Sequence, residues 1–153
     1  MKRDSRLSGV LHVLLHMAET DSPVTSERLA QMMRTNPVVI RRILAGLRKQ
    51  GFVSSEKGHG GGWRLSCDLN AVTLHDIYTA LGSPGLLAIG NRSESPGCLV
   101  EDAVNTVMNE AFHDAETLLL ARFSEVTLAE LSNHMRQRMD ERGSCGEQDD
   151  EAS

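Results

Sequence analysis

Apolar positions in the first fifty residues recur at steps of three and four, the spacing of one face of an α-helix. This spacing predicts three helices, over residues 5–19, 26–33 and 37–50. Asn36 is a favoured N-cap residue, and Pro37 is suited to the first helical position that follows it. A short helix, a three-residue turn and a longer helix together form the helix-turn-helix pattern.

A two-stranded hairpin is predicted directly after the third helix. The stretches FVSSE (52–56) and WRLS (63–66) have the composition of strands, and four of the 13 glycines lie between them. A phosphate-binding loop of this composition would open a helix, whereas here a second strand follows, so we interpret the glycines as a hairpin tip. A hairpin that follows the longer helix of a helix-turn-helix is the wing of a winged-helix domain.

The second half of the chain is predicted to be helical. The capping box Thr73-Leu-His-Asp76 opens a short helix that ends near residue 81, and a loop rich in glycine, serine and proline follows. Steps of three and four over 99–123 predict a long helix that resembles a coiled-coil seam. A second capping box, Thr127-Leu-Ala-Glu130, opens a last helix through about Met139.

These elements predict a mostly α fold, a winged helix-turn-helix DNA-binding domain with a two-stranded wing and a long C-terminal dimerisation helix. The expected boundaries are 1–82 for the DNA-binding domain, 83–98 for the loop, 99–139 for the dimerisation helices and 140–153 for a disordered acidic tail. The apolar stripe on the long helix either forms a dimer seam or packs on its own domain. The expected seam consists of Val104, Val107, Met108, Ala111 and Leu118.

Charge is unevenly distributed along the chain. Residues 1–66 hold 11 Lys and Arg against 5 Asp and Glu, a net +6, and residues 67–153 hold 5 against 16, a net −11. A basic half is a candidate for polyanion binding, although a strongly charged surface also serves solubility alone. Because no apolar run approaches 18 residues and no signal-peptide pattern opens the chain, we expect no membrane span and a cytoplasmic protein.

The basic side chains of the predicted third helix and hairpin are candidates for contact with DNA. Arg41, Arg42, Arg48 and Lys49 share the outward face of the helix. The residues at its start lie where base edges are read, and valines there either touch thymine methyl groups or pack within the domain. The candidate contacts are Thr35, Asn36, Val39, Arg41, Arg42, Lys49, Lys57, His59, Gly60, Gly61 and Arg64.

The glycines of the hairpin allow the backbone to approach a phosphate or to enter a minor groove. We therefore expect replacement of Gly60, Gly61 and Gly62 by alanine to impair DNA binding more than folding.

Three stretches carry a family resemblance: RRILAGLRKQGFVSSEKGHGGGWRLS, VTLHDIYTALG and PGCLVEDAVNTVM. Together they resemble the Rrf2 family of bacterial winged-helix regulators, which includes repressors that sense iron–sulfur clusters or nitric oxide and regulators of cysteine metabolism. The resemblance covers nearly all of residues 1–139. It implies a homodimer that binds a partly palindromic operator, usually as a repressor, with the long helix in dimerisation.

The cysteines depart from the cluster-binding pattern of that family. Cluster-binding members have three cysteines around the start of the long helix, whereas residues 83–110 here hold only Cys98, with Cys67 and Cys145 elsewhere. The chain therefore resembles the cluster-free branch, and we expect no cofactor. Cys98 is either a thiol sensor, its thiolate favoured by the helix N-terminus and disfavoured by Glu101 and Asp102, or a packed and inert residue.

Other functions remain as alternatives at this stage. A winged helix also serves as a protein-interaction module without DNA, and a metal-dependent redox sensor is a further possibility. His12 and His16 have the spacing of metal ligands, but the sequence specifies no further ligand, so we expect no metal site. The chain contains no nucleophile elbow, P-loop or HExxH motif, so we do not expect an enzyme.

Overall fold

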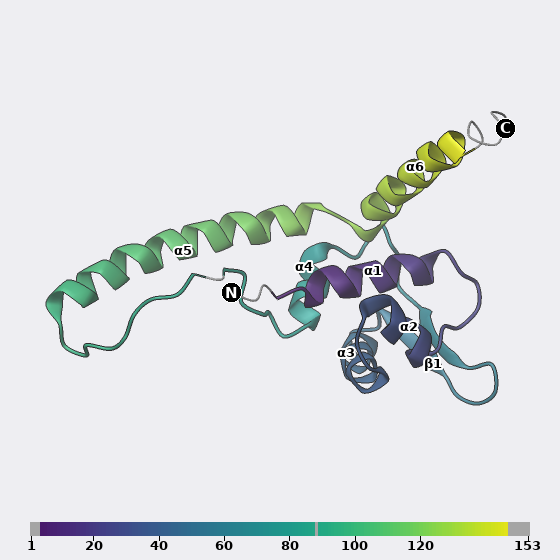
Figure 1. The fold of residues 1–153 in the computed structure, drawn as a ribbon, viewed down its shortest axis with the longest axis horizontal. Helices are drawn as coiled ribbons and strands as arrows, with labels where there is room; N and C mark the ends of the chain where they lie inside the picture. The colour runs from purple at the N-terminus through teal and green to yellow at the C-terminus, as the bar shows by residue number, and fades with distance from the viewer. Residues whose placement is uncertain (1–3, 88, 147–153) are drawn as a thin grey trace.

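The computed structural model describes residues 4–87 and 89–146, and it is mostly helical with one small sheet (Figure 1). The first part of the chain forms a winged helix-turn-helix, and two long helices follow it, which confirms the predicted fold class. The elements in chain order are α1 (Arg6–Ala18), α2 (Ser26–Met33), α3 (Pro37–Lys49), β1 (Val53–Glu56), β2 (Gly62–Leu65), α4 (Leu74–Ala80), α5 (Leu99–Glu125) and α6 (Leu128–Gly146).

Side-chain caps set the starts of both helices of the helix-turn-helix. The Thr25 hydroxyl accepts a hydrogen bond from the Arg28 N–H at 3.2 Å, and Asn36 Oδ1 accepts one from the Val39 N–H at 3.1 Å. Each bond satisfies a backbone donor that the first turn of a helix leaves unpaired. Arg34 ends α2 in the left-handed conformation, with φ of 53°, and so turns the chain sharply into α3.

The hairpin is tied to the rest of the domain by its tryptophan. β1 and β2 pair antiparallel with Ser55 opposite Trp63, and the Trp63 backbone also exchanges two hydrogen bonds with Val24, at 2.8 and 2.9 Å. The indole is buried, and its Nε1–H donates to the buried Ser26 Oγ at 2.9 Å. The wing is therefore fixed to the start of α2 by backbone and side chain together.

The hydrophobic core lies where the three helices of the first half meet the hairpin and α4. It is built from aliphatic side chains at the helical spacing seen in the sequence, which explains how a chain with 3% aromatic residues can fold. The largest fully buried side chains are Leu14, Leu29, Ile40, Leu44, Leu47, Ile77, Leu128, Val10, Val13 and Val53.

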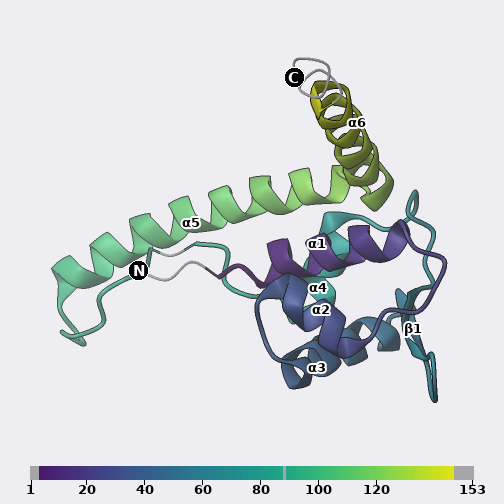
Figure 2. The same ribbon diagram turned by 45° about the vertical axis from the view of Figure 1, so that its right-hand side comes forward.

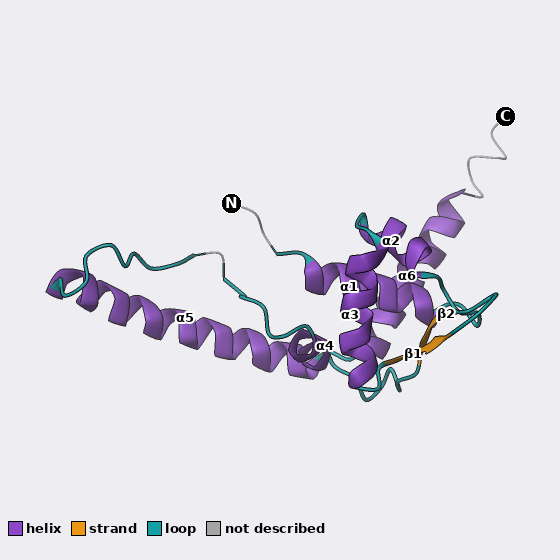
Figure 3. Ribbon diagram, turned by 90° about the horizontal axis from the view of Figure 1, so that it is seen from below, coloured by secondary structure: helices purple, strands orange, loops and turns teal. Residues whose placement is uncertain are grey.

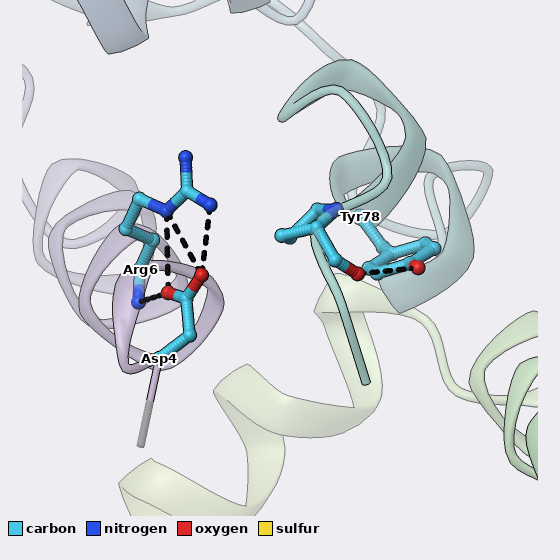
Figure 4. Close-up of polar contacts among 4 residues, drawn as sticks. Asp4, Arg6 and Tyr78 are labelled. Atoms are coloured by element: carbon cyan, nitrogen blue, oxygen red, sulfur yellow. Dashed lines mark hydrogen bonds and ion pairs between the residues drawn. The ribbon is translucent and has the colours of Figure 1, made fainter. Parts of the chain in front are cut away.

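Tyr78 connects α4 to the chain segments that lead into and out of the long helix. Its hydroxyl donates to the Pro84 carbonyl at 2.7 Å (Figure 4). Its ring meets Phe123 of α5 edge to face at a centroid distance of 6.2 Å. Burial raises the pKa of the Tyr78 phenol above its usual range. The same view shows the Asp4–Arg6 ion pair at the start of α1, which lowers the pKa of the exposed Asp4 carboxyl.

The two C-terminal helices differ in their relation to the core. No residue of α5 is buried, and most of its length projects away from the body, with the preceding loop running back alongside it (Figure 1). The first turn of α6, in contrast, belongs to the winged-helix core: Leu128 is fully buried, and its N–H donates to the Val72 carbonyl at 2.9 Å. Leu128, which the expected boundaries assign to the dimerisation helices, therefore packs in the core of the winged-helix domain.

The last helix is also longer than predicted. α6 continues to Gly146, so residues 140–146 are helical and do not belong to a disordered tail. Residues 140–142, Asp-Glu-Arg, carry no helix breaker, and helix propensity therefore does not favour a stop at Met139. The remainder of the expected tail, 147–153, lies outside the described residues.

The bond between Trp63 and Ser26 should contribute measurably to stability. Trp63→Phe leaves the buried Ser26 hydroxyl unpaired, and Ser26→Ala leaves the indole N–H unpaired, so each should lower the free energy of unfolding by about 1–3 kcal/mol. The double variant should lose less than the sum of the two. Urea unfolding followed by far-UV circular dichroism measures all three, and strictly additive losses would show that the bond contributes nothing.

Candidate nucleic-acid interface

α3 turns one face to the core and the other to solvent. Ile40, Leu44 and Leu47 are buried, whereas Arg41, Arg42 and Lys49 are exposed. The opposite faces follow from helical periodicity, because the buried residues recur at steps of three and four and the basic ones fall between them. The predicted outward position of these three cations is therefore what the structure shows.

The exposed cations of α3 differ in their partners. Arg41 Nη2 lies 3.0 Å from Glu27 Oε1 of α2, and both side chains are more than half exposed. Such a surface ion pair is worth little, so its guanidinium can exchange to another anion at small cost. Arg42 and Lys49 form no ion pair or side-chain hydrogen bond with any other residue in the described part of the chain.

Arg48, which shares the outward face of α3 but was not among the candidate contacts, bonds to the hairpin. Its guanidinium donates to Ser55 Oγ of β1 at 3.1 Å and lies 5.8 Å from the centre of the Trp63 ring. These contacts hold the C-terminal end of α3 against the hairpin. Arg48 therefore joins the two parts of the candidate interface and does not extend the free cationic face of α3.

Some polar groups at the start of α3 are engaged in hydrogen bonds within the domain. Asn36 Oδ1 is engaged in the helix cap, and the Thr35 N–H donates to the Ala30 carbonyl at 2.9 Å. Val39 is half-buried, whereas Val38 is 59% exposed. Of Val38 and Val39, the two valines at the start of α3, Val38 is thus the one that presents its side chain to solvent.

The tip of the wing is exposed and carries the remaining predicted contacts. Lys57, His59 and Gly60 lie at the surface, and Gly58 and Gly60 have positive φ angles of 96° and 77°, which glycine adopts without strain. The Arg64 side chain, in contrast, is paired at the base of the wing. Its Nε lies 2.9 Å from Glu56 Oε1, and Nη1 donates to the Asp21 carbonyl.

Two of the wing glycines are required by the fold itself. A Cβ at Gly61 would lie 2.3 Å from the Glu56 carbonyl oxygen, and one at Gly62 would lie 2.6 Å from the Val24 carbonyl oxygen. Both neighbours are backbone atoms that cannot move aside. Alanines at Gly61 and Gly62 should therefore impair folding as well as binding, against the expectation that the triple replacement impairs binding more than folding, because they would force the hairpin apart or off Val24.

The helix and the wing lie on the same side of the molecule. In Figure 2, α3 and the hairpin are at the bottom and α5 and α6 at the top, and Figure 3, seen from below, shows α3 and the strands clear of the long helix. A helix of this exposure fits the major groove of DNA, and a hairpin beside it reaches the adjoining backbone or groove.

Arg34 is a cation in this region that was not among the contacts predicted from the sequence. Arg34 lies in the turn between α2 and α3, is exposed, and has no ion pair within the described residues. Arg34 adopts the left-handed backbone that ends α2 and so lies outside both helices. A prediction based on the faces of helices therefore does not include it. Its position two residues before the Asn36 cap was the available signal.

The two cysteines whose side chains the structure describes, Cys67 and Cys98, lie in different parts of the fold. Cys98 is exposed at the N-cap of α5, and Cys67 is half-buried in the winged-helix domain, where burial raises the pKa of its thiol. Among the side chains that the structure describes, those of residues 4–87 and 89–142, no three His, Cys, Asp or Glu residues gather as metal ligands. An iron–sulfur cluster takes four ligands, mostly thiolates, so the residues described in one chain do not fit one.

The architecture defines a winged helix-turn-helix DNA-binding domain, and comparison with known proteins identifies its family. The model of the Rrf2 family, described as iron-dependent transcriptional regulators, matches residues 3–134, so the chain belongs to the Rrf2 family.

Individual relatives agree with this assignment. YwnA of Bacillus subtilis (strain 168) is 26% identical over 132 residues, which are 86% of this chain and 98% of YwnA. The HTH-type transcriptional regulator IscR of Yersinia enterocolitica is 26% identical over 128 residues, 84% of this chain and 74% of IscR. A Lactobacillus plantarum crystal structure superposes with a TM-score of 0.68 at 25% identity and covers 97% of this chain and 99% of that one.

The chain is thus a DNA-binding transcriptional regulator and not an enzyme, as its family comparisons indicate. None of the helices in the described residues has the length and apolar character needed to cross a membrane.

Arg42 should contribute to DNA affinity through charge. Arg42→Ala should weaken binding to a mixed-sequence duplex and make the slope of log K against log salt less negative by about 0.9 if the residue neutralises one phosphate. If it meets a base instead, the loss should be about 1–3 kcal/mol and confined to the preferred sequence. The matched control is Arg138→Ala on the exposed side of α6. Equal affinities and slopes for both variants and the wild type would remove Arg42 from the interface.

Proposed function

We propose that this protein is a homodimeric repressor that binds a partly palindromic operator with α3 and the wing. The observation that carries the proposal is a set of exposed cations, Arg42 and Lys49 on α3 and Lys57 on the wing, that form no ion pair within the described residues. The two elements that carry them, α3 and the hairpin, lie at the same side of the domain in Figure 2. These cations lie in the chain half with a net +6 charge. We place the protein in the cytoplasm with the chromosome it would regulate.

Within this proposal the contacts divide by position. Thr35, Asn36, Val39 and the exposed Val38 lie at the start of α3, the part of a recognition helix that reaches base edges. Arg41, Arg42 and Lys49 follow the groove or its phosphates. Lys57, His59, Gly60 and Gly61 bring the wing to an adjoining groove or backbone, and Arg64 acts by bracing the base of the wing.

The competing function is a protein-interaction module that uses the winged helix without DNA. The two are separated by the salt dependence of duplex binding. A surface that neutralises several phosphates should lose at least tenfold in affinity between 50 and 200 mM salt, since each phosphate contact adds about 0.9 to the slope. Absence of duplex binding at 50 mM salt, with the protein folded, would favour the protein-interaction function.

Dimerisation is proposed to use α5. Val104, Val107 and Leu118 are 51%, 66% and 74% exposed, so the apolar stripe is not packed on the chain's own domain. Ala111 shares this exposed stripe, whereas Met108 is half-buried and lines a cavity of about 440 Å³ with the loop residues Asn91 and Arg92. Met108 therefore belongs mainly to the contact with the loop.

The double change Val104→Glu, Ala111→Glu should give a folded monomer. Both residues are exposed in the single chain, so the charges need not disturb its core, but they would be buried unpaired in a dimer seam. Multi-angle light scattering measures the mass, and circular dichroism checks the fold. A matched control, Thr117→Glu, is exposed on another side of α5 and should remain dimeric. A double variant that still runs as a dimer would contradict the seam.

We propose a thiol as the sensor and Cys98 as its position. The residue is exposed, its carbonyl accepts the Asp102 N–H at 3.0 Å, and the other backbone donors of the first turn of α5 lie nearby. Oxidation by peroxide converts a thiolate to a sulfenic acid and reduces the peroxide to water. A polar group formed there would adjoin the proposed dimer helix. The alternatives are an effector that is a small molecule or a partner protein, or a cluster sensor, which the ligands of one chain do not support.

Peroxide should lower operator binding by the wild type and leave Cys98→Ser unaffected. Cys67→Ser provides the control. Burial raises the pKa of the Cys67 thiol, so a smaller fraction of it is the reactive thiolate, and the variant without it should still respond to peroxide. Gel-shift titration before and after peroxide measures the change. An equal response in wild type and Cys98→Ser would exclude Cys98 as the sensor.

A further inference from the structure

The solvent side of α3 carries a row of residues that all point in one direction. The outer row consists of Val38, Arg42, Ala45 and Lys49, which recur at steps of four, three and four. At 3.6 residues per turn these steps keep the four residues within about 60° of one another around the helix. Val38, Arg42 and Lys49 are exposed and Ala45 is half-buried, so the outer row faces away from the core.

Two further arginines lie on one flank of the outer row. Arg41 and Arg48 are about a quarter turn to its side, and a neighbouring element holds each of them. Arg41 is paired with Glu27 of α2 at 3.0 Å, and Arg48 donates to Ser55 of β1 at 3.1 Å. A guanidinium held at the flank of a helix faces the phosphates at the edge of a groove, whereas the outer row faces the bases.

We propose that Arg42 binds a guanine and that Val38 contacts the methyl group of a thymine one or two base pairs away. The inference deepens the proposed operator binding and rests on it. Arginine donates two N–H groups to O6 and N7 of guanine, and thymine is the base with a C5 methyl group in the major groove. Val38 and Arg42 are one turn apart, about 6 Å along the helix, and base pairs follow one another at about 3.4 Å.

The surroundings of Arg42 leave its guanidinium available for this contact. It forms no ion pair or side-chain hydrogen bond with any other residue that the structure describes. The next residue of the outer row is Ala45, whose short side chain does not hold the helix away from the groove. Lys49, about 16 Å beyond Val38, is the last residue of α3 and lies far from the N-terminal part of a recognition helix that reaches base edges.

The start of α3 also disfavours a different base preference. Asparagine binds adenine by accepting from N6 and donating to N7 with its amide. Asn36 Oδ1 already accepts the Val39 N–H at 3.1 Å, so this two-bond contact would break the helix cap. Val38, in contrast, is 59% exposed and has no polar group, and a thymine methyl group would cover it. The combination therefore favours guanine and thymine over adenine at this end of the helix.

Modified bases test the two contacts on a duplex selected from a random pool. Each guanine of a half-site is replaced in turn by 7-deazaguanine, which lacks the N7 acceptor, and each thymine by deoxyuridine, which lacks the methyl group. For the wild type, one 7-deazaguanine should weaken binding about tenfold, the contribution of a hydrogen bond to a charged group. One deoxyuridine within two base pairs of it should weaken binding about fourfold, the contribution of one buried methyl group.

Protein variants assign each effect to a residue. Arg42→Ala should lose the sensitivity to 7-deazaguanine, Val38→Ser should lose the sensitivity to deoxyuridine, and Arg42→Gln should prefer adenine where the wild type prefers guanine. The matched control is Arg41→Gln on the flank, which should weaken binding to all duplexes alike and keep both sensitivities. Both residues of the proposed contact are exposed, and circular dichroism checks that the variants are folded.

The failure of this assignment is distinguishable from the failure of the proposed function. A selected duplex that binds tightly but shows the same base sensitivities with the wild type, Arg42→Ala and Val38→Ser would overturn the assignment and leave operator binding intact. Loss of the guanine sensitivity in Arg41→Gln in place of Arg42→Ala would overturn it as well. A folded protein that binds no duplex at 50 mM salt would overturn both.

Discussion

The anchoring of Trp63 at the start of α2 is the constraint on which the geometry of the proposed DNA-binding face, α3 and the wing, depends. Its backbone pairs with Val24, its indole N–H bonds to Ser26, and Arg48 lies over its ring. Through these contacts the hairpin cannot move independently of α2 and α3. The spacing between α3 and the wing is thus set inside the protein, and if this surface binds DNA as proposed, its preformed geometry avoids the ordering cost that a mobile hairpin would incur on binding.

The long helix presents the opposite situation. No residue of α5 is fully buried within its own chain, and the helix meets the body where Phe123 contacts Tyr78, so the single chain leaves a large apolar stripe and an apolar groove in water. Exposed apolar surface of this kind marks an interaction site. If a second copy covers it, the geometry of the α5 pair fixes the separation of the two recognition helices, and any chemistry at Cys98 acts on the same helix that sets this separation.

The features predicted correctly from the sequence are those determined by neighbouring residues, above all the starts of the helices. Thr25, Asn36 and Thr73 are capping residues recognisable from their neighbours alone, so the helix starts agree closely with the structure. The sequence did not predict contacts between distant segments: Arg64 bonds to Asp21, 43 residues away, and Arg48 stacks on Trp63, and both look like free cations in a linear reading. The need for glycine at positions 61 and 62 could not be predicted for the same reason, since the backbone atoms that Gly61 and Gly62 approach belong to the opposite strand and to Val24. The burial of Leu128 likewise depends on a tertiary contact with the segment before α4.

The central claim is that α3 and the wing of two chains read one operator together. Hydroxyl-radical footprinting on a duplex selected from a random pool tests it most directly. The account predicts two protected half-sites related by a two-fold axis, with centres one helical turn, about 34 Å, apart or a multiple of that distance. It also predicts flanking protection that disappears when Lys57 and His59 are replaced by alanine. A single protected stretch without symmetry, or flanking protection that survives the loss of both wing residues, would contradict the account.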